Sequence, residues 1–171
     1  MSKKSKLIII TGTPATGKST LAKILVKQLN YEHLDLHQYY KQLATQYNKK
    51  KQCYDLNQKK VLKLVREKLT STKKEGIIID SHISHHLPKS LVNLCIVLTC
   101  SNLKELEKRL KNRKYSKQKI RENLDAEIFQ ICLTQAQENG HNLIVIDTST
   151  KIDLSNRLKT IKNKLKFPKS L

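Results

Sequence analysis

The stretch at positions 12–20, GTPATGKST, has the residue types and spacing of a loop that binds phosphate. It satisfies the pattern GxxxxGK[ST], in which two glycines precede a lysine and a hydroxyl residue, here Lys18 and Ser19. Glycines let successive backbone N–H groups curl around phosphate oxygens, and the start of the following helix adds its positive dipole end. Lys18 would reach the β and γ phosphates, and Ser19 would bind Mg²⁺. The expected nucleotide contacts are Gly12, Pro14, Ala15, Thr16, Gly17, Lys18, Ser19 and Thr20.

The nucleotide held by this loop is better predicted as ATP than as a dinucleotide or GTP. The dinucleotide pattern GxGxxG would require glycine at position 14, where Pro14 stands. A guanine site of the common GTPase kind would add NKxD late in the chain, and residues 142–149, NLIVIDTS, do not contain it. We therefore expect ATP and Mg²⁺ as the cofactors.

A candidate metal ligand ends the apolar stretch in residues 77–82, IIIDSH. An acid at the tip of a buried strand is what the second Mg²⁺ contact of such a site needs. Asp80 is therefore predicted to bind the metal together with Ser19, Asp80 acting through a water molecule. The alternative is that Asp80 is a surface acid that does not bind a metal. The histidines that follow could suggest a zinc site, but no further ligands accompany them at a defined spacing.

The elements that must position these residues alternate between strand and helix. Short apolar runs rich in β-branched residues predict buried strands at residues 7–11, 31–36, 76–80, 94–99 and 142–147. Helical spacing predicts helices from residue 18, near 37–45, and at 56–69, 103–110, 116–139 and 154–165, with a lysine-rich loop before the third. Such alternation implies right-handed crossovers. We predict an α/β fold with a doubly wound five-stranded parallel sheet flanked by helices, in a single domain spanning residues 1–171.

The charge of the chain is unusual, because 34 lysines and arginines against 14 acids give a formal net charge of +20. The excess gathers near residues 3–6, 49–51, 111–119 and 159–169. Such a surface should attract polyanions through counterion release, so contact with nucleic acid or a ribosome is one interpretation. The other interpretation is that the lysines only cover solvent-exposed faces of the protein. The sequence contains no aromatic pattern of the kind that stacks RNA bases.

Cysteine use and hydropathy indicate an intracellular protein. The 4 cysteines show no CxxC pairing, which predicts reduced thiols. No apolar run is long enough to span a bilayer, and the basic N-terminus lacks a cleavage site. We expect a soluble, unprocessed protein without a membrane partner, cytoplasmic, or nuclear if the source is eukaryotic.

Three stretches together resemble the CINAP-type adenylate kinases, the isoenzyme 6 family of archaea and eukaryotes. They are ITGTPATGKST, IIIDSH and KRLKNRKYSKQKIRENLDAEIFQICLTQA, in register from about residue 7 to residue 136. The most specific pattern is RxYSxxKIxENLxxEIFQ at residues 113–130. The resemblance implies a P-loop fold like that of nucleoside monophosphate kinases. It also implies an AMP-binding segment at about residues 35–58 and a lid at about residues 112–122.

The resemblance implies roles for individual residues as well. Asp80 and His82 would form a Walker-B-like element, and Arg113 would belong to the lid over ATP. Arg109, one helical turn earlier, could face the same phosphates or could be a solvated helix arginine. With Lys18 these residues form the predicted catalytic set. They would act by positioning the phosphates and by neutralising charge on the moving phosphoryl group.

The implied reaction transfers the γ-phosphoryl group of ATP to AMP and gives two ADP, with ATPase activity when water takes the place of AMP. Residues 35–42, DLHQYYKQ, depart from the family, which has a stretch like NVGDLARE there. Asp35 and Lys41 are the candidate AMP contacts, and Lys41 replaces an arginine that grips phosphate with a bidentate fork. The family is also implied to act in small ribosomal subunit assembly and rRNA processing, with a ribosomal protein and pre-rRNA as partners. The alternative is therefore an ATPase-type assembly factor with little or no AMP kinase activity.

Overall fold

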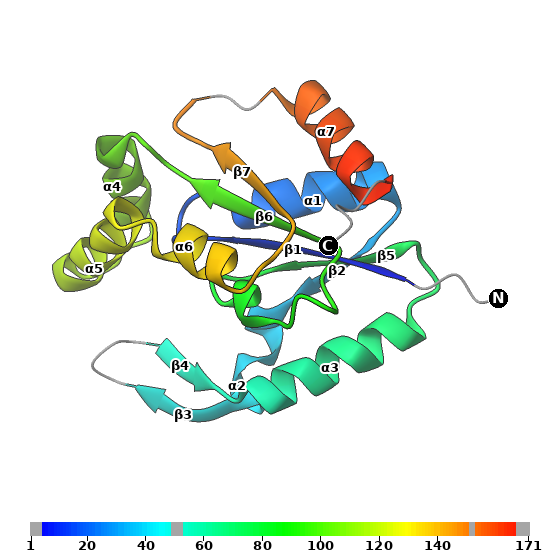
Figure 1. Ribbon diagram of the computed structural model, residues 1–171. Coiled ribbons are helices and arrows are strands. Elements are labelled where there is room, and N and C mark those ends of the chain that lie inside the picture. Colours follow the sequence, from blue (N-terminus) through cyan, green and yellow to red (C-terminus); the bar gives the residue numbers. More distant parts are fainter. Residues whose placement is uncertain (1–4, 49–52, 151–152, 167–171) are drawn as a thin grey trace.

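The computed structural model describes residues 5–48, 53–150 and 153–166, and its centre is a five-stranded parallel sheet (Figure 1). The strands lie in the order β2 (Glu32–Asp35), β5 (Gly76–Asp80), β1 (Lys6–Gly12), β6 (Leu94–Thr99) and β7 (Leu143–Asp147). Every neighbouring pair is parallel. The strands on one side of β1, β2 and β5, come earlier in the chain than those on the other side, β6 and β7. The direction of strand addition therefore reverses at β1. In α/β folds, ligands bind in the crevice at the C-terminal ends of the strands at such a point. The predicted doubly wound sheet is confirmed.

Helices cover both faces of the sheet (Figure 1). Their bounds are α1 (Lys18–Leu29), α2 (Tyr40–Leu43), α3 (Gln58–Ser71), α4 (Leu103–Asn112), α5 (Lys117–Ile128), α6 (Ile131–Glu138) and α7 (Leu154–Lys166), with 3₁₀ turns η1 (Leu36–Tyr39) and η2 (Ser84–His86). Helices α1 and α7 pack on one face, and α3 and α6 on the other. In β1, Ile8 and Ile10 belong to the first face and Leu7 and Ile9 to the second, and all four are fully buried. Burial on both sides explains why this strand is apolar throughout rather than alternating.

The single helix expected at residues 116–139 is two helices in the structure. Helix α5 ends at Ile128 and α6 begins at Ile131, because Gln130 between them adopts a left-handed backbone conformation with φ of 49°. The bend redirects the chain so that Ala136 of α6 packs in the core against the sheet. The apolar periodicity continues across the bend, which is why the sequence pattern predicted one helix.

The residues between α2 and α3 form an antiparallel hairpin where a loop was expected. Strand β3 (Ala44–Asn48) pairs with β4 (Cys53–Leu56), and Tyr47 lies opposite Tyr54 with ring centroids 4.9 Å apart. Cross-strand aromatic pairs of this kind stabilise a two-stranded ribbon. The polar helix expected near residues 37–45 is shorter, a 3₁₀ turn followed by the single turn of α2. The lysines at positions 49–51, and those at 3, 4 and 169, lie outside the described residues.

Cys95, Cys100 and Cys132 are free thiols. Burial raises the pKa of Cys95 to about 12, so this thiol stays protonated within the core. Over the ranges that the structure describes, none of the helices combines the length and the apolar character needed to cross a bilayer.

Candidate active site

The loop between β1 and α1 has the backbone conformation that phosphate binding requires. Gly12 has a φ of 136° and lies against the carbonyl of Leu98 in β6, where an added Cβ would be 2.2 Å from the oxygen. Gly17 caps α1 in the left-handed conformation, with a φ of 92°. Thr16 Oγ1 donates to the Thr13 carbonyl at 2.8 Å and holds the loop curled. Such a loop, running into a helix N-terminus, presents backbone N–H groups to an anion.

Lys18 closes this loop from the inside. Its Nζ donates to the carbonyls of Gly12 at 2.7 Å and Thr13 at 2.9 Å, and the residue is only 9% exposed. Burial lowers the pKa of Lys18 to about 8, so the ammonium group is charged at neutral pH but poorly solvated. A cation with little solvent around it interacts strongly with a nearby anion. The residue types and the geometry therefore agree on phosphate as the partner.

Three side chains from separate elements meet at the C-terminal end of β5. Ser19 Oγ donates to Asp80 Oδ2 at 2.5 Å, and His33 Nε2 donates to Asp80 Oδ1 at 2.5 Å. Asp80 is 1% exposed. Burial acts to raise its pKa, but the hydrogen bonds from His33 and Ser19 outweigh burial and hold the pKa below its usual value. A hydroxyl and an ionised carboxylate are the oxygen donors that Mg²⁺ prefers, so the two residues predicted for the metal lie together and fit it.

His33 is a member of this group that the sequence did not predict. It lies in the edge strand β2, which pairs with β5 although the two strands are far apart in the chain. The hydrogen bond to Asp80 is the main cause of its raised pKa. The only signal in the sequence was a histidine within a predicted strand, and the contact follows from the strand order.

A cavity of about 1060 Å³ opens beside the loop. This volume is slightly above the roughly 300–1,000 Å³ typical of small-molecule sites. Its lining on the loop side includes Thr13, Pro14, Ala15, Gly17, Lys18, Ser19, His82 and Arg113. Its lining on the hairpin side includes His37, Tyr40, Tyr47, Tyr54, Asp55, Gln58 and Lys59. One hollow therefore joins the phosphate loop to the segment expected to bind the acceptor.

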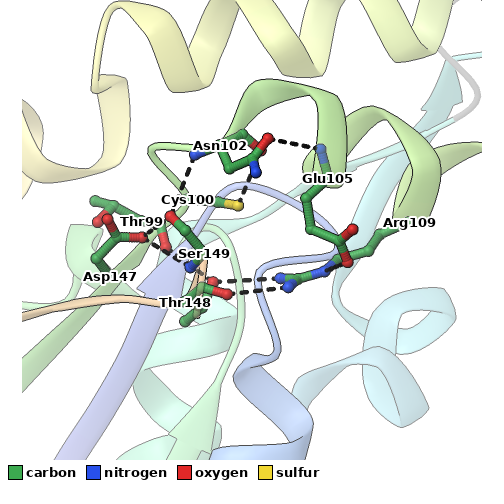
Figure 2. A network of polar contacts seen from close by, with 8 residues as sticks. All are labelled: Thr99, Cys100, Asn102, Glu105, Arg109, Asp147, Thr148 and Ser149. Carbon is green, nitrogen blue, oxygen red and sulfur yellow. Dashed lines mark hydrogen bonds and ion pairs between the residues drawn. The ribbon is translucent and has the colours of Figure 1, made fainter. Parts of the chain in front are cut away.

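A second hollow, of about 640 Å³, also borders the loop and contains Arg109. Its lining includes Ala15, Thr16, Gly17, Thr20, Arg109, Arg113 and Thr148. Arg109 donates to the backbone carbonyl of Thr148 at 3.0 Å and pairs with Glu105 at 2.9 Å. Figure 2 shows the Arg109 side chain reaching from α4 to Thr148. Arg113 lines both hollows, whereas Arg109 lines only the second of them.

The segment that carries Thr148 is fixed by Asp147 at the end of β7 (Figure 2). Asp147 accepts hydrogen bonds from the backbone N–H of Ser101 at 3.2 Å and that of Ser149 at 2.9 Å, and from both serine hydroxyls. Thr148 itself donates through its backbone N–H to the Thr99 carbonyl at 2.8 Å. This part of the wall is therefore rigid, because Asp147, Thr148 and Ser149 each hydrogen-bond to β6 or to the turn that follows it.

The two candidate AMP residues lie apart from both hollows. Asp35 caps η1 by accepting a hydrogen bond from the backbone N–H of His37 at 3.0 Å, and Lys41 is an exposed residue of α2. Neither side chain lines either cavity. Lys59, at the start of α3, is a cation that does line the larger one. The sequence could not indicate Lys59, because its position depends on the unpredicted hairpin.

The histidines after β5 have different roles. His82 lines the larger cavity, and burial, followed by the charge of Lys18, lowers its pKa to about 4, so it is neutral. His85 is 2% exposed and lies between Thr11, whose hydroxyl is 2.8 Å from Nδ1, and Gln135, whose side-chain oxygen is 2.8 Å from Nε2. Within the described part of the chain, no group of three histidine, cysteine or acidic side chains is placed to hold a metal ion.

His85 should make the stability of the protein depend on pH. Burial lowers its pKa to about 4, whereas the unfolded chain has a pKa near 6.5. The unfolded state therefore binds a proton first as the pH falls, and stability is lost between about pH 6.5 and pH 4. Between pH 7 and pH 5 we expect this histidine to contribute a loss of about 1–2 kcal/mol in the free energy of unfolding.

The measurement is urea unfolding of the wild type and His85→Gln at pH 7 and pH 5. Glutamine cannot titrate, so the variant should lose less stability over this interval, even if it is less stable at pH 7. An equal loss in both proteins would show that His85 is not the group responsible.

The sheet order, the loop closed by Lys18 and the hydrogen-bonded Ser19–Asp80 pair define a P-loop nucleotide-binding protein. The sequence matches the AAA domain family over residues 8–130. Among solved structures, it is similar to a gluconokinase from Sinorhizobium meliloti 1021, with a TM-score of 0.57, 14% identity and coverage of 96% of this chain and 93% of that one. That likeness concerns the fold alone.

Curated relatives define the family more narrowly. The chain is 39% identical to the adenylate kinase isoenzyme 6 homolog of Schizosaccharomyces pombe, over 82% of this chain and 79% of the relative. It is 34% identical to the Dictyostelium discoideum homolog, over 82% and 79%, and 31% identical to the Drosophila melanogaster homolog, over 91% and 89%. The chain belongs to the adenylate kinase isoenzyme 6 family, as the resemblance predicted. Fold and relatives together support a nucleotide kinase function.

Proposed function

We propose that this protein is an adenylate kinase that transfers the γ-phosphoryl group of ATP to AMP. The observation that carries the proposal is the larger cavity, whose lining includes both the phosphate loop with Lys18 and the aromatic hairpin. Phosphoryl transfer needs donor and acceptor in one enclosed space with their phosphates in line. Relatives that carry the adenylate kinase name support AMP as the acceptor.

The donor triphosphate would lie along the loop, with Lys18 at its β and γ phosphates and Arg113 facing the same cavity. The adenine would lie on the side of the second hollow, against Arg109 and Thr148. Ser19 and Asp80 would hold Mg²⁺, which neutralises phosphate charge when it is bound. In this arrangement the protein needs no general base, because its contribution is positioning and charge neutralisation.

The acceptor would lie on the hairpin side of the larger cavity. The rings of Tyr40, Tyr47 and Tyr54 form a connected aromatic wall there, with centroid separations of 6.3 Å and 4.9 Å. A purine base can stack on such a surface, and Lys59 could neutralise the acceptor phosphate. We assign residues 35–58 to acceptor binding and residues 112–122, which span the turn between α4 and α5 and the first half of α5, to the lid. Asp35 and Lys41 would contact AMP only after a movement of this segment.

The test is the rate of ADP formation from ATP and Mg²⁺, measured with and without AMP and with GMP, CMP or UMP in its place. We expect AMP to raise the rate well above that with ATP alone, and to do so more than the other monophosphates. If AMP leaves the rate unchanged, the kinase proposal fails.

The second candidate is an ATPase that assists small ribosomal subunit assembly. The formal net charge of +20 supports it, and so does the exposure of Lys41, which leaves the predicted AMP contact outside the cavity. Pull-downs at low and moderate salt should then retain a ribosomal protein or pre-rRNA, with the salt dependence typical of phosphate contacts. Absence of both at each salt concentration would count against this role.

A further inference from the structure

His33 contacts the proposed metal-binding carboxylate from β2, an element separate from the phosphate loop. Asp80 uses its two oxygens differently: Oδ1 accepts from His33 Nε2, and Oδ2 accepts from Ser19 Oγ, each at 2.5 Å. Ser19 belongs to α1 and His33 to β2, so the carboxylate is held between two elements.

Without His33, the Asp80 carboxylate would have only the Ser19 hydrogen bond to keep it from turning. The last torsion of an aspartate side chain has a broad energy profile, so a second hydrogen bond, on the other oxygen, restricts the rotation further. His33 supplies that bond from a strand whose backbone is tied to β5, with Leu34 opposite Ile79 and Asp35 opposite Asp80. A donor mounted on a sheet is held more rigidly than one on a loop.

The burial of the pair adds to the effect. The side chain of Asp80 is 1% exposed and that of His33 is 24% exposed, so water has little access to the Oδ1 side. If the imidazole were lost, Oδ1 would be left with an unsatisfied buried charge or would turn toward another donor. In either case the position of Oδ2 would depend on the Ser19 hydroxyl without the second hydrogen bond from His33.

We propose that His33 is a positioning residue for the metal site, which fixes Asp80 Oδ1 and thereby presents Oδ2, beside the Ser19 hydroxyl, to Mg²⁺. The proposal rests on the proposed function only in so far as Ser19 and Asp80 hold the Mg²⁺ of bound ATP. Residues that orient a metal ligand in this way typically change metal affinity or activity by about 10- to 100-fold when they are replaced.

The experiment measures ATP binding by calorimetry, first in EDTA and then over a range of Mg²⁺ concentrations, with no acceptor present. The variants are His33→Leu, which removes the donor, and His33→Gln, whose amide can reach the position of Nε2. We expect His33→Leu to bind ATP in EDTA as the wild type does, within about twofold. In His33→Leu, the Mg²⁺ concentration that gives half of the metal-dependent gain in ATP affinity should be about tenfold or more above the wild-type value. In His33→Gln, it should return to within about threefold of the wild-type value.

An unchanged Mg²⁺ dependence in His33→Leu would overturn the proposal. So would an equal loss of ATP affinity in EDTA, which would mean that His33 supports the fold of the loop and not the carboxylate. If His33→Leu does not fold, as judged by thermal unfolding, His33→Asn replaces it. Its amide is polar but too short to reach Oδ1, so it should behave as the leucine variant does, and a wild-type Mg²⁺ dependence would overturn the proposal.

Failure of the kinase proposal would look different. A wild-type protein that binds ATP with normal Mg²⁺ dependence, yet transfers no phosphate to AMP, would contradict the acceptor assignment and leave the role of His33 intact. A wild-type protein whose ATP binding shows no Mg²⁺ dependence would overturn the role of His33.

Discussion

Replacing Lys18 with alanine should lower kcat/KM for phosphoryl transfer by about 100-fold or more, which is the usual effect of removing one preorganised donor to a developing anionic charge. Lys18 is the buried ammonium group that closes the phosphate loop through the Gly12 and Thr13 carbonyls. Alanine removes the charge and also the two contacts that hold the loop closed. The measurement is the initial rate of ADP formation with ATP alone and with ATP plus AMP, and both rates should fall.

Lys27→Ala is the matched control for this prediction. Lys27 lies in the same helix but is exposed and lies in its last turn, away from the loop. Its replacement should leave both rates of ADP formation within about twofold of the wild-type rates, because an exposed lysine contributes little beyond local charge. If Lys18→Ala keeps more than a tenth of the wild-type rate, the assignment of Lys18 to the phosphates is wrong.

Replacing Gly12 with alanine should lower the free energy of unfolding by about 2–6 kcal/mol, because overpacking and backbone strain each cost about 1–3 kcal/mol. The new Cβ would lie 2.2 Å from the Leu98 carbonyl oxygen, and that backbone cannot withdraw without breaking the pairing of β1 with β6. The φ of 136° at Gly12 is itself unfavourable for any residue with a side chain. Urea unfolding measures the loss directly.

Gly17→Ala separates the two causes. Gly17 has a φ of 92°, but no atom lies within 4 Å of the position that a Cβ would take. This variant should therefore show the cost of strain alone, about 1–2 kcal/mol. Equal losses for the two variants would show that the contact with Leu98 does not control stability at Gly12.

The phosphate loop and the sheet could be predicted because their signals are local. The apolar run ending at Gly12 is continuous because β1 is buried on both faces, and the glycine–lysine–serine spacing follows from the chemistry of one short loop. Asp80 could be predicted for the same reason, since it stands at the tip of another such run.

The contacts that the sequence did not predict depend on which elements lie side by side. His33 reaches Asp80 only because β2 is the neighbour of β5, and a single sequence does not contain that order. Gln130 adopts a left-handed conformation without being a glycine, so nothing local indicated the bend between α5 and α6. The hairpin that brings Tyr54 to the cavity depends on the pairing of β3 with β4, which the lysine-rich composition of this segment did not indicate.

Arg109 and Lys41 are further residues whose surroundings the sequence did not predict. Each was predicted from its place in a motif, but a motif does not give the direction of a side chain. The guanidinium of Arg109 is bound to Thr148 at the second hollow, and Lys41 is exposed on α2. Their contributions are best tested one at a time, as KM for ATP in an Arg109→Ala variant and KM for AMP in a Lys41→Ala variant.

The most direct test of the central claim follows the labelled γ-phosphate of ATP in a reaction with Mg²⁺ and AMP. The account predicts that most of the label appears in ADP, because the acceptor lies in the same cavity as the donor and takes the phosphoryl group before water does. Label found only in inorganic phosphate, at a rate that AMP does not change, would contradict it.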